Sequence, residues 1–296
     1  MASDPSQPET GRVRRRVWRI ARPLLVAYFL IILGMMFLET WLVYPIPALK
    51  RGDWKPTSFQ FEDVNFTSAD GTKLHGWFMP HANSTRAILY CHGNGEDVAS
   101  IGELAAHLSR ELQASVFVFD YRGYGRSEGT PNEAGCIADG IAAQEWLAKR
   151  TNMRPNKVVV MGRSLGSAVA TAIAAERGAR ALILESAFPT MPDVAALHYS
   201  WLPVRWIMKN RYDNLARIKH YDAPLLQSHG IADRLIPIQL AQTLFDASPS
   251  AQKEWLAFDH LGHNDLPPRP YYGNLVDFLN NLDRPNGHTD FPASTK

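Results

Sequence analysis

The sequence predicts an α/β fold in which a mostly parallel, doubly wound sheet follows an N-terminal antiparallel hairpin. Short apolar, β-branched runs alternate with helix-length segments from residue 59 to residue 282. Asp70-Gly71 marks a tight turn between the first two runs, as in a hairpin. Polar residues lie just past many of the predicted strand ends, at the sheet edge where ligands bind in such folds. These residues are His92, Asp120, Ser164, Glu185, Asp233 and His263.

Length, charge and cysteine content narrow the class of protein. The chain of 296 residues is long enough for about two domains, but one α/β domain with an anchor also fits. The net charge of +2 gives no sign of a nucleic-acid partner. Cys91 is expected to be a small core residue, with a reactive thiol beside His92 as the alternative. No Cys/His cluster has zinc spacing and no glycine-rich phosphate loop occurs, so we expect no metal and no organic cofactor.

The N-terminal region has the pattern of a membrane anchor. Residues 24–44 are apolar almost throughout and reach the length of about 20 residues that a spanning helix needs. Glu39, Trp41 and Tyr44 are expected near the outer interface of the bilayer. A cleaved signal peptide and an interfacial or buried helix are the alternatives. The preceding segment, residues 1–23, contains a basic block made of Arg12, Arg14, Arg15, Arg16, Arg19 and Arg22.

The position of this basic block predicts the orientation of the anchor. Positively charged segments next to a span stay in the cytoplasm, and no comparable block follows the span. We therefore expect a single-pass membrane protein that contacts the lipid bilayer through its N-terminal helix. Its N-terminus is expected in the cytoplasm and its catalytic domain on the non-cytoplasmic side.

The rest of the chain is interpreted as a linker, one domain and a tail. Residues 45–58 are expected to be a proline-containing linker, residues 59–283 the α/β domain and residues 284–296 a flexible tail. The predicted strands are residues 59–66, 73–79, 87–91, 115–119, 158–160, 181–184, 223–227 and 254–258. The predicted helices are residues 98–112, 133–150, 167–176, 237–247 and 270–282.

The sequence Gly162-Arg163-Ser164-Leu165-Gly166 has the context of a nucleophile elbow. A β-branched strand precedes it, and a helix of small residues follows. Glycines at both ends allow a sharp turn that leaves the Ser164 hydroxyl exposed at the apex. An ordinary strand-to-helix turn with a capping serine uses the same residue types. The partners of Ser164 therefore decide between the two interpretations.

Two later strand ends supply the expected partners of Ser164. A serine nucleophile needs a base, usually histidine, that a carboxylate orients. In a fold of this kind the chain order is Ser, then Asp or Glu, then His, and Asp233 and His263 satisfy that order. Three alternatives stay open: Asp233 as a plain turn residue, Glu185 as the acid, and His260 as the base.

An oxyanion hole needs two N–H donors that point to the same place. One is expected from Leu165, at the start of the helix that follows the nucleophile. The other is expected from the loop after strand 87–91, where Asn94 is the first choice and Gly95 the second. A plain turn is the alternative for this loop. Residues 120–127 are expected to form a structural turn near the pocket, with contact to the substrate as the alternative.

Seven segments carry a resemblance to a known family: residues 92–95, 119–129, 162–166, 213–219, 229–233, 237 and 262–265. They resemble the α/β-hydrolase superfamily and, within it, the membrane-anchored Bem46-like branch of serine hydrolases. The resemblance extends from about residue 59 to residue 282. It implies Ser164 as the nucleophile, His263 as the base and Asp233 as the orienting acid. The motifs specify a fold and a triad, but they do not specify a substrate.

The sequence thus predicts a serine hydrolase that acts on carboxylic esters or thioesters. An apolar insertion, residues 188–221, either covers the site and receives an acyl chain or packs as a short helical cap. If it receives a chain, Trp201 and Trp206 are expected to line the pocket. The nearby anchor favours lipid or acylated substrates. A peptidase or amidase with the same triad, and a binding protein without activity, are the alternatives.

Overall fold

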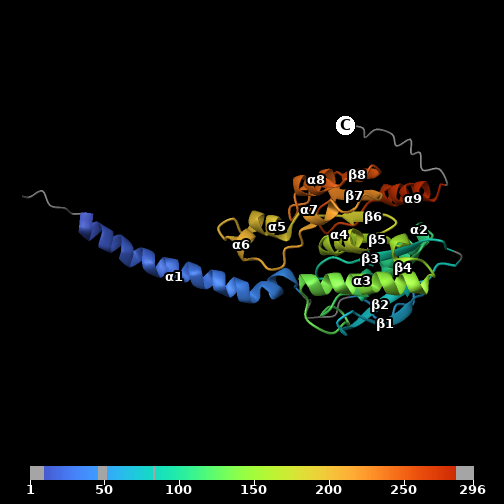
Figure 1. Ribbon diagram of the computed structural model, residues 1–296, viewed down its shortest axis with the longest axis horizontal. Coiled ribbons are helices and arrows are strands. Elements are labelled where there is room, and N and C mark those ends of the chain that lie inside the picture. The colour runs from blue at the N-terminus through green and yellow to red at the C-terminus, as the bar shows by residue number, and fades with distance from the viewer. Residues whose placement is uncertain (1–9, 46–51, 83, 285–296) are drawn as a thin grey trace, which may run out of the picture.

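The computed structural model of the chain describes residues 10–45, 52–82 and 84–284. The C-terminal half of a long helix, α1 (Thr10–Val43), lies against the α/β domain, and the rest of the helix extends away from the domain (Figure 1). The predicted tail, apart from its first residue, and residues 46–51 of the predicted linker lie outside the described residues.

Helix α1 contains both the arginine block and the apolar stretch. Its segment Arg14–Val43 is long and apolar enough to cross a membrane, with a mean hydropathy of 2.1 in its apolar window. None of the residues in that window is buried inside the protein. The helix includes Pro23 and continues through it. Length and composition therefore agree with a membrane span, while its orientation stays a prediction.

In the described part of the chain, eight strands form one sheet in the order β1-β2-β4-β3-β5-β6-β7-β8. The first two strands form an antiparallel hairpin, β2 pairs antiparallel with β4, and all other neighbours pair in parallel. The predicted fold class is confirmed. The strands are β1 (Glu62–Thr67), β2 (Lys73–Met79), β3 (Ala87–Cys91), β4 (Ser115–Asp120), β5 (Val159–Arg163), β6 (Leu182–Glu185), β7 (Leu225–Gly230) and β8 (Lys253–Phe258).

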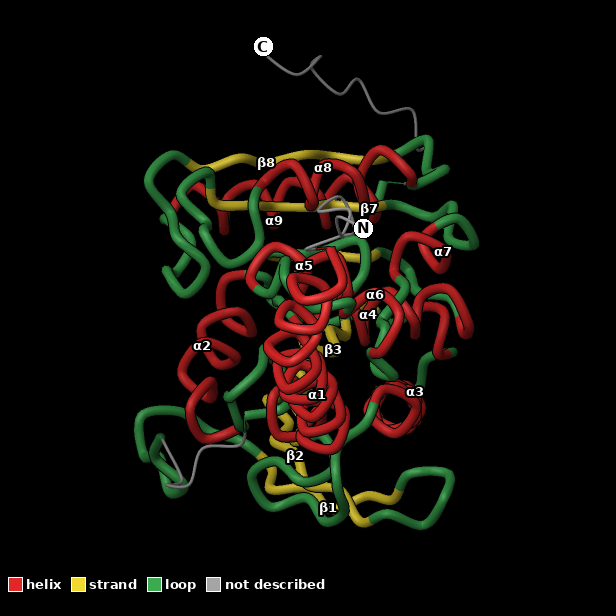
Figure 2. Tube along the Cα trace, turned by 90° about the vertical axis from the view of Figure 1, so that its left-hand side faces the viewer, coloured by secondary structure: helices red, strands yellow, loops and turns green. Residues whose placement is uncertain are grey.

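Helices cover both faces of this sheet (Figure 2). One face carries α3, α4 and α8, and the other carries α2 and α9, each over its own buried apolar cluster. The sheet is therefore the middle of three layers. The helices are α2 (Val98–Glu111), α3 (Glu133–Arg150), α4 (Leu165–Arg177), α8 (Ile238–Ala247) and α9 (Arg269–Asp283). A short 3-10 turn, η1 (Pro155–Lys157), precedes β5.

The predicted elements agree with the structure apart from shifts at their ends. The strand predicted at residues 223–227 is shifted, because β7 continues to Gly230 and pairs there with Phe258 of β8. The first strand begins at Glu62 and not at residue 59. Strand ends depend on the neighbouring strand, which an apolar run alone does not reveal.

The predicted cap contains three short helices, α5 (Met191–His198), α6 (Val204–Ile207) and α7 (Asn214–Ile218). In Figure 1, α5 and α6 lie beside the C-terminal half of α1. They project from the same end of the domain as the anchor. The cap and the anchor therefore approach the carboxyl ends of the central strands together.

Buried polar contacts hold the end of α1 on the domain. The Oε1 atom of Glu39 accepts hydrogen bonds from the backbone N–H groups of Lys209 and Asn210, at 2.9 and 2.8 Å. It also accepts one from the Asn210 side chain at 3.0 Å. The Tyr44 hydroxyl donates to Asn210 Oδ1 at 2.9 Å. Glu39 and Tyr44 are both buried against the domain, whereas Trp41 is exposed, and the predicted place of all three at the bilayer interface stays a prediction.

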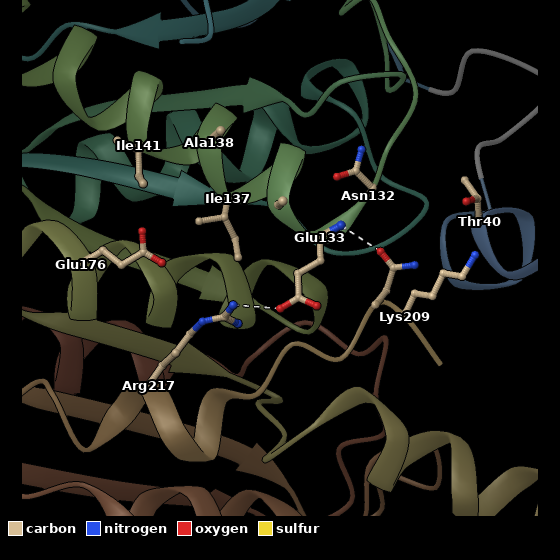
Figure 3. Close-up of a pocket in the computed structure, with 11 residues that line it drawn as sticks. Thr40, Asn132, Glu133, Ile137, Ala138, Ile141, Glu176, Lys209 and Arg217 are labelled. Atoms are coloured by element: carbon tan, nitrogen blue, oxygen red, sulfur yellow. Dashed lines mark hydrogen bonds and ion pairs between the residues drawn. The ribbon is translucent and has the colours of Figure 1, made fainter. Parts of the chain in front are cut away.

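Figure 3 shows a pocket next to this attachment. Glu133 points toward Arg217, and their side chains form an ion pair at 2.8 Å. The backbone N–H of Glu133 donates to the same Asn210 Oδ1 atom that Tyr44 contacts. Thr40 of α1 lines this pocket too. Asn210 therefore joins the anchor, the cap and α3.

Candidate active site

The backbone at Ser164 has the conformation of a nucleophile elbow. Ser164 is the single residue between β5 and α4, and its φ of 52° and ψ of −118° are unfavourable for a residue with a side chain. Neighbouring glycines make the turn possible. A Cβ at Gly166 would meet the Cys91 carbonyl oxygen at 2.0 Å, and one at Gly162 would meet the Gly166 oxygen at 2.2 Å. The elbow therefore requires glycine at both positions.

The structure brings three sequence-predicted residues together at the carboxyl ends of the strands. Ser164 Oγ lies 2.9 Å from His263 Nε2. His263 Nδ1 lies 2.8 Å from Asp233 Oδ2. The alternatives considered from the sequence lie elsewhere: Glu185 accepts a hydrogen bond from the Tyr271 hydroxyl, and His260 is exposed. This hydrogen-bonded chain has the arrangement in which an imidazole takes a proton from a serine.

Asp233 is held as a carboxylate. Its Oδ1 atom accepts hydrogen bonds from the backbone N–H groups of Leu235 and Ile236, at 2.9 and 2.8 Å. Burial raises its pKa, but the hydrogen bonds from His263 and Ile236 outweigh burial and hold the pKa below the usual value of an aspartate. The ionised carboxylate can therefore orient the imidazole and stabilise its protonated form.

A buried histidine lies on the far side of Asp233. His229 Nε2 donates to the Ile236 carbonyl at 2.7 Å and lies 3.4 Å from Asp233 Oδ2. Burial lowers the pKa of His229 from the usual value of a histidine, which favours its neutral form. His229 belongs to the motif that ends at Asp233, but nothing in the sequence indicates a separate role for it.

The two expected oxyanion donors border the serine from different elements. Leu165 is the first residue of α4, so its N–H has no partner within the helix. Asn94 lines the same cavity as Ser164, whereas Gly95 does not, which favours the first choice over the second. The Asn94 side chain is engaged elsewhere: Nδ2 donates to the Val43 carbonyl at 2.5 Å, and Oδ1 accepts from the Tyr124 hydroxyl at 2.6 Å. Its backbone N–H therefore stays the candidate donor.

The loop that carries Asn94 is fixed from several sides. The Gly93 N–H donates to Glu96 Oε2 at 2.6 Å. The Tyr121 hydroxyl donates to the His92 carbonyl at 3.1 Å. The turn at residues 120–127 therefore supports the loop from behind, and its residues do not line the cavity, as expected for a structural turn.

Arg163 supports the loop of the histidine, a role that the sequence did not reveal. Its Nη2 atom donates to the carbonyl oxygen of His263 at 2.8 Å and lies 3.5 Å from that of Asp265. Asp265 Oδ2 in turn accepts from the Gly262 N–H at 2.7 Å and closes the same loop. Arg163 occupies the unspecified position before the serine in the Gly-x-Ser-x-Gly motif. The motif therefore gives almost no indication of this role.

A cavity of about 550 Å³ lies beside Ser164. Two groups of apolar residues form much of its wall. They are Leu42 and Val43 at the end of α1 with Pro45 just after it, and Met191, Val194, Ala195 and Tyr199 from the cap. Trp201 and Trp206 do not line this cavity, so their predicted place in a pocket is wrong. Both are largely exposed, because they lie on the outer side of the cap.

The other reactive groups have structural surroundings. Cys91 is buried in β3, as predicted, and burial raises the pKa of its thiol. Among the residues that the structure describes, no group of three or more His, Cys, Asp or Glu side chains is placed to hold a metal ion.

Comparison with known proteins identifies the family. The family model described as "alpha/beta hydrolase fold" matches residues 86–217. An uncharacterized protein of Mycobacterium tuberculosis is 40% identical over 205 residues, which cover 69% of this chain and 72% of the relative. The chain belongs to the α/β-hydrolase family. The bem46 protein of Schizosaccharomyces pombe is 30% identical over 280 residues, which cover 88% of this chain and 93% of that protein.

Solved structures agree with this α/β-hydrolase assignment at the level of the fold. An esterase of Pyrococcus furiosus superposes with a TM-score of 0.66 at 22% identity, and the match covers 79% of this chain and 98% of the esterase. The resemblance inferred from the sequence motifs, including the Bem46-like relatives, is confirmed.

Proposed function

We propose that this α/β-hydrolase is a membrane-anchored serine hydrolase that cleaves carboxylic esters or thioesters. The observation that carries the proposal is the unbroken hydrogen-bonded chain from Ser164 Oγ through His263 to Asp233, with distances of 2.9 and 2.8 Å. Its direction matches the transfer of a proton away from the serine.

The reaction follows from the positions of these groups. Ser164 Oγ attacks the carbonyl carbon while His263 Nε2 takes its proton. The N–H groups of Leu165 and Asn94 stabilise the negative charge that develops on the carbonyl oxygen. The leaving alcohol or thiol receives the proton from His263, and an acyl-enzyme is left. Water, activated by the same imidazole, then releases the acid and restores Ser164.

Anchoring by α1 is the second part of the proposal. The apolar part of α1 spans the bilayer, the arginine-rich start stays in the cytoplasm, and the catalytic domain lies on the other side. Residues 59–283 act as one catalytic domain with its cap at residues 188–221. The apolar cavity wall and the esterase among the structural neighbours both favour esters over charged substrates.

A panel of acyl substrates tests the proposal. Purified full-length protein should hydrolyse p-nitrophenyl esters and acyl thioesters faster than the matching anilides. Replacement Ser164→Ala should lower kcat for every substrate by about a thousandfold or more, because the nucleophile is lost. Equal activity of wild type and Ser164→Ala, or a clear preference for anilides, would count against an ester or thioester hydrolase.

A further inference from the structure

Another cavity lies next to the cavity at Ser164, on the side of the membrane anchor. This second cavity of about 100 Å³ lies between α1 and the cap. Leu42, Val43 and Tyr199 line both cavities, so the two share a wall. We call the two cavities together the anchor–cap groove. The other residues of the smaller cavity are Met35, Met36, Glu39, Val204, Ile207 and Met208.

One face of α1 follows the cap over a long distance. Tyr28, Met35, Glu39 and Leu42 are spaced by seven, four and three residues, which places them on the same side of a helix. The Tyr28 hydroxyl donates to the Trp201 carbonyl at 2.8 Å, and the two rings lie 6.3 Å apart. The cap thus lies along the anchor from Val43 back to Tyr28, over about 20 Å of helix.

This contact lies within the apolar part of α1. When α1 spans a bilayer, the outer side of the cap therefore lies at the level of the bilayer too. Exposed apolar side chains on both elements fit that position. They are Phe37, Leu38 and Trp41 on α1, and Leu197, Trp201 and Trp206 on the cap. Aromatic residues, tryptophan above all, are typical of the membrane interface, and a soluble surface rarely gathers so many.

The wall of the smaller cavity suits a hydrocarbon chain. Apart from Glu39, its lining consists of Met, Leu, Val, Ile and Tyr side chains. The Oε1 atom of Glu39 already accepts three hydrogen bonds from Lys209 and Asn210. An apolar chain in this cavity leaves those bonds intact, whereas a polar group there loses its hydration without gaining a comparable partner.

Resting on the proposed function, we propose that the substrate is a long-chain ester of a bilayer lipid whose acyl chain lies in the anchor–cap groove. The chain enters sideways between α1 and the cap, and its carbonyl carbon reaches Ser164. Ser164 Oγ bonds to that carbon, the ester C–O bond breaks, and His263 gives the proton to the leaving alcohol. Water then releases the fatty acid.

The edges of the sheet favour a lipid over an acylated peptide. Peptide substrates are commonly held along the free edge of a sheet, where their backbone finds hydrogen-bond partners. The edge strands here are β1 and β8, and none of their residues lines the described parts of the groove. A lipid needs no such edge.

Variants that fill the groove test this inference in the full-length protein. Vesicles of dioleoylphosphatidylcholine that contain dioleoylglycerol serve as the lipid substrate, and p-nitrophenyl acetate serves as the short ester. Met35→Trp should lower the ratio of oleate release to acetate hydrolysis by about tenfold or more, since it fills the space of several methylene groups. Ile207→Trp, from the cap side, should do the same. Leu38→Trp is the matched control, because Leu38 is exposed on α1 and lies outside the groove, and its ratio should equal that of wild type.

Labelling with a fluorophosphonate separates the failure of this inference from the failure of the proposed function. Absence of labelling and of acetate hydrolysis in the wild type would refute both. Normal labelling with no oleate release refutes the lipid substrate alone. An unchanged ratio of oleate release to acetate hydrolysis, in groove variants that still react with the probe, also refutes the lipid substrate alone. Faster cleavage of a palmitoyl-cysteinyl peptide than of dioleoylglycerol in the same vesicles also overturns the inference, in favour of an acylated peptide.

Discussion

At the scale of single residues, the candidate site depends on backbone conformations that few residues tolerate. Ser164 has a positive φ, and the glycines on either side leave no room for a Cβ. Such strain persists only where the surrounding structure fixes it. Here β5, α4 and the end of β3 enclose the turn, so the serine hydroxyl is presented to His263 without rearrangement.

Activity should fall as the pH is lowered, because protonation of the His263 imidazole removes the base. The hydrogen bonds to Asp233 hold its pKa below the usual value of an aspartate, which favours the ionised carboxylate over this range. The stabilisation of the folded protein by the Asp233 carboxylate is therefore complete above the pKa that this group has in the unfolded chain. It is lost only as the pH falls through the lower pKa of the same group in the folded state. The rate of p-nitrophenyl acetate hydrolysis, measured between about pH 5 and pH 8, should thus fall toward low pH while the protein stays folded. A flat profile would contradict a histidine base.

Arg163 should matter for turnover although it lies outside the proton-transfer chain. Replacement Arg163→Met removes the hydrogen bond to the His263 carbonyl, and a small displacement of the imidazole lowers kcat by about 10- to 100-fold. Steady-state kinetics with a short ester should show this loss in kcat more than in KM. Arg177→Met, on the exposed side of α4, is the control and should behave as wild type. Unchanged kcat in Arg163→Met would show that the loop holds its position alone.

At the scale of secondary-structure elements, the sequence predicted the fold better than it predicted the surroundings of individual side chains. Apolar runs and turn residues located the strands and helices, and the elbow motif placed Ser164 between β5 and α4. The position of Glu39 was not predictable, because its partner Asn210 lies 171 residues away. Periodicity shows which face of a helix is apolar, but it does not show what covers that face.

The tryptophans of the cap illustrate the same limit. Their apolar character suggested a pocket, yet Trp201 and Trp206 lie on the outer side of the cap. Residues with less conspicuous side chains, such as Met191 and Ala195, line the cavity instead. An apolar insertion in the sequence is compatible with tryptophans inside the pocket and with tryptophans on the outer side of the cap. Only the packing of α5 and α6 against α1 decides between these two arrangements.

The attachment of α1 should contribute to stability through Glu39. Glu39→Ala leaves the N–H groups of Lys209 and Asn210 without their buried acceptor, at a cost of about 1–3 kcal/mol in the free energy of unfolding. Thermal unfolding of the detergent-solubilised protein should therefore begin several degrees lower. Trp41→Ala, on an exposed position of the same helix, should have little effect. If Glu39→Ala and Trp41→Ala melt together with wild type, the attachment adds no stability.

At the scale of the whole molecule, the anchor forms part of the wall of the candidate site. The last residues of α1 line the cavity, and the Val43 carbonyl binds the side chain of Asn94 in the proposed oxyanion loop. The candidate span and the candidate active site are thus linked by direct contact. A change in the position of α1 is expected to reach the oxyanion loop through this one hydrogen bond.

The proposed orientation is open to a direct test in cells. Alkaline phosphatase fused after residue 296 should be active in a bacterial host, because that enzyme matures only outside the cytoplasm, whereas a matching cytoplasmic reporter should be silent. Replacement of the arginine block by glutamines should weaken this preference. A fusion with the opposite reporter pattern would place the domain in the cytoplasm and leave the chemistry of Ser164 unaffected.

The central claim is that Ser164 is the nucleophile of a serine hydrolase, and peptide mapping of a fluorophosphonate adduct tests it most directly. The full-length protein is treated with the probe and digested, and the modified residue is located by mass spectrometry. We expect one adduct, on Ser164, formed at a rate that falls sharply when His263 is replaced by alanine. An adduct on another residue, or no adduct in protein that is folded, would contradict the account.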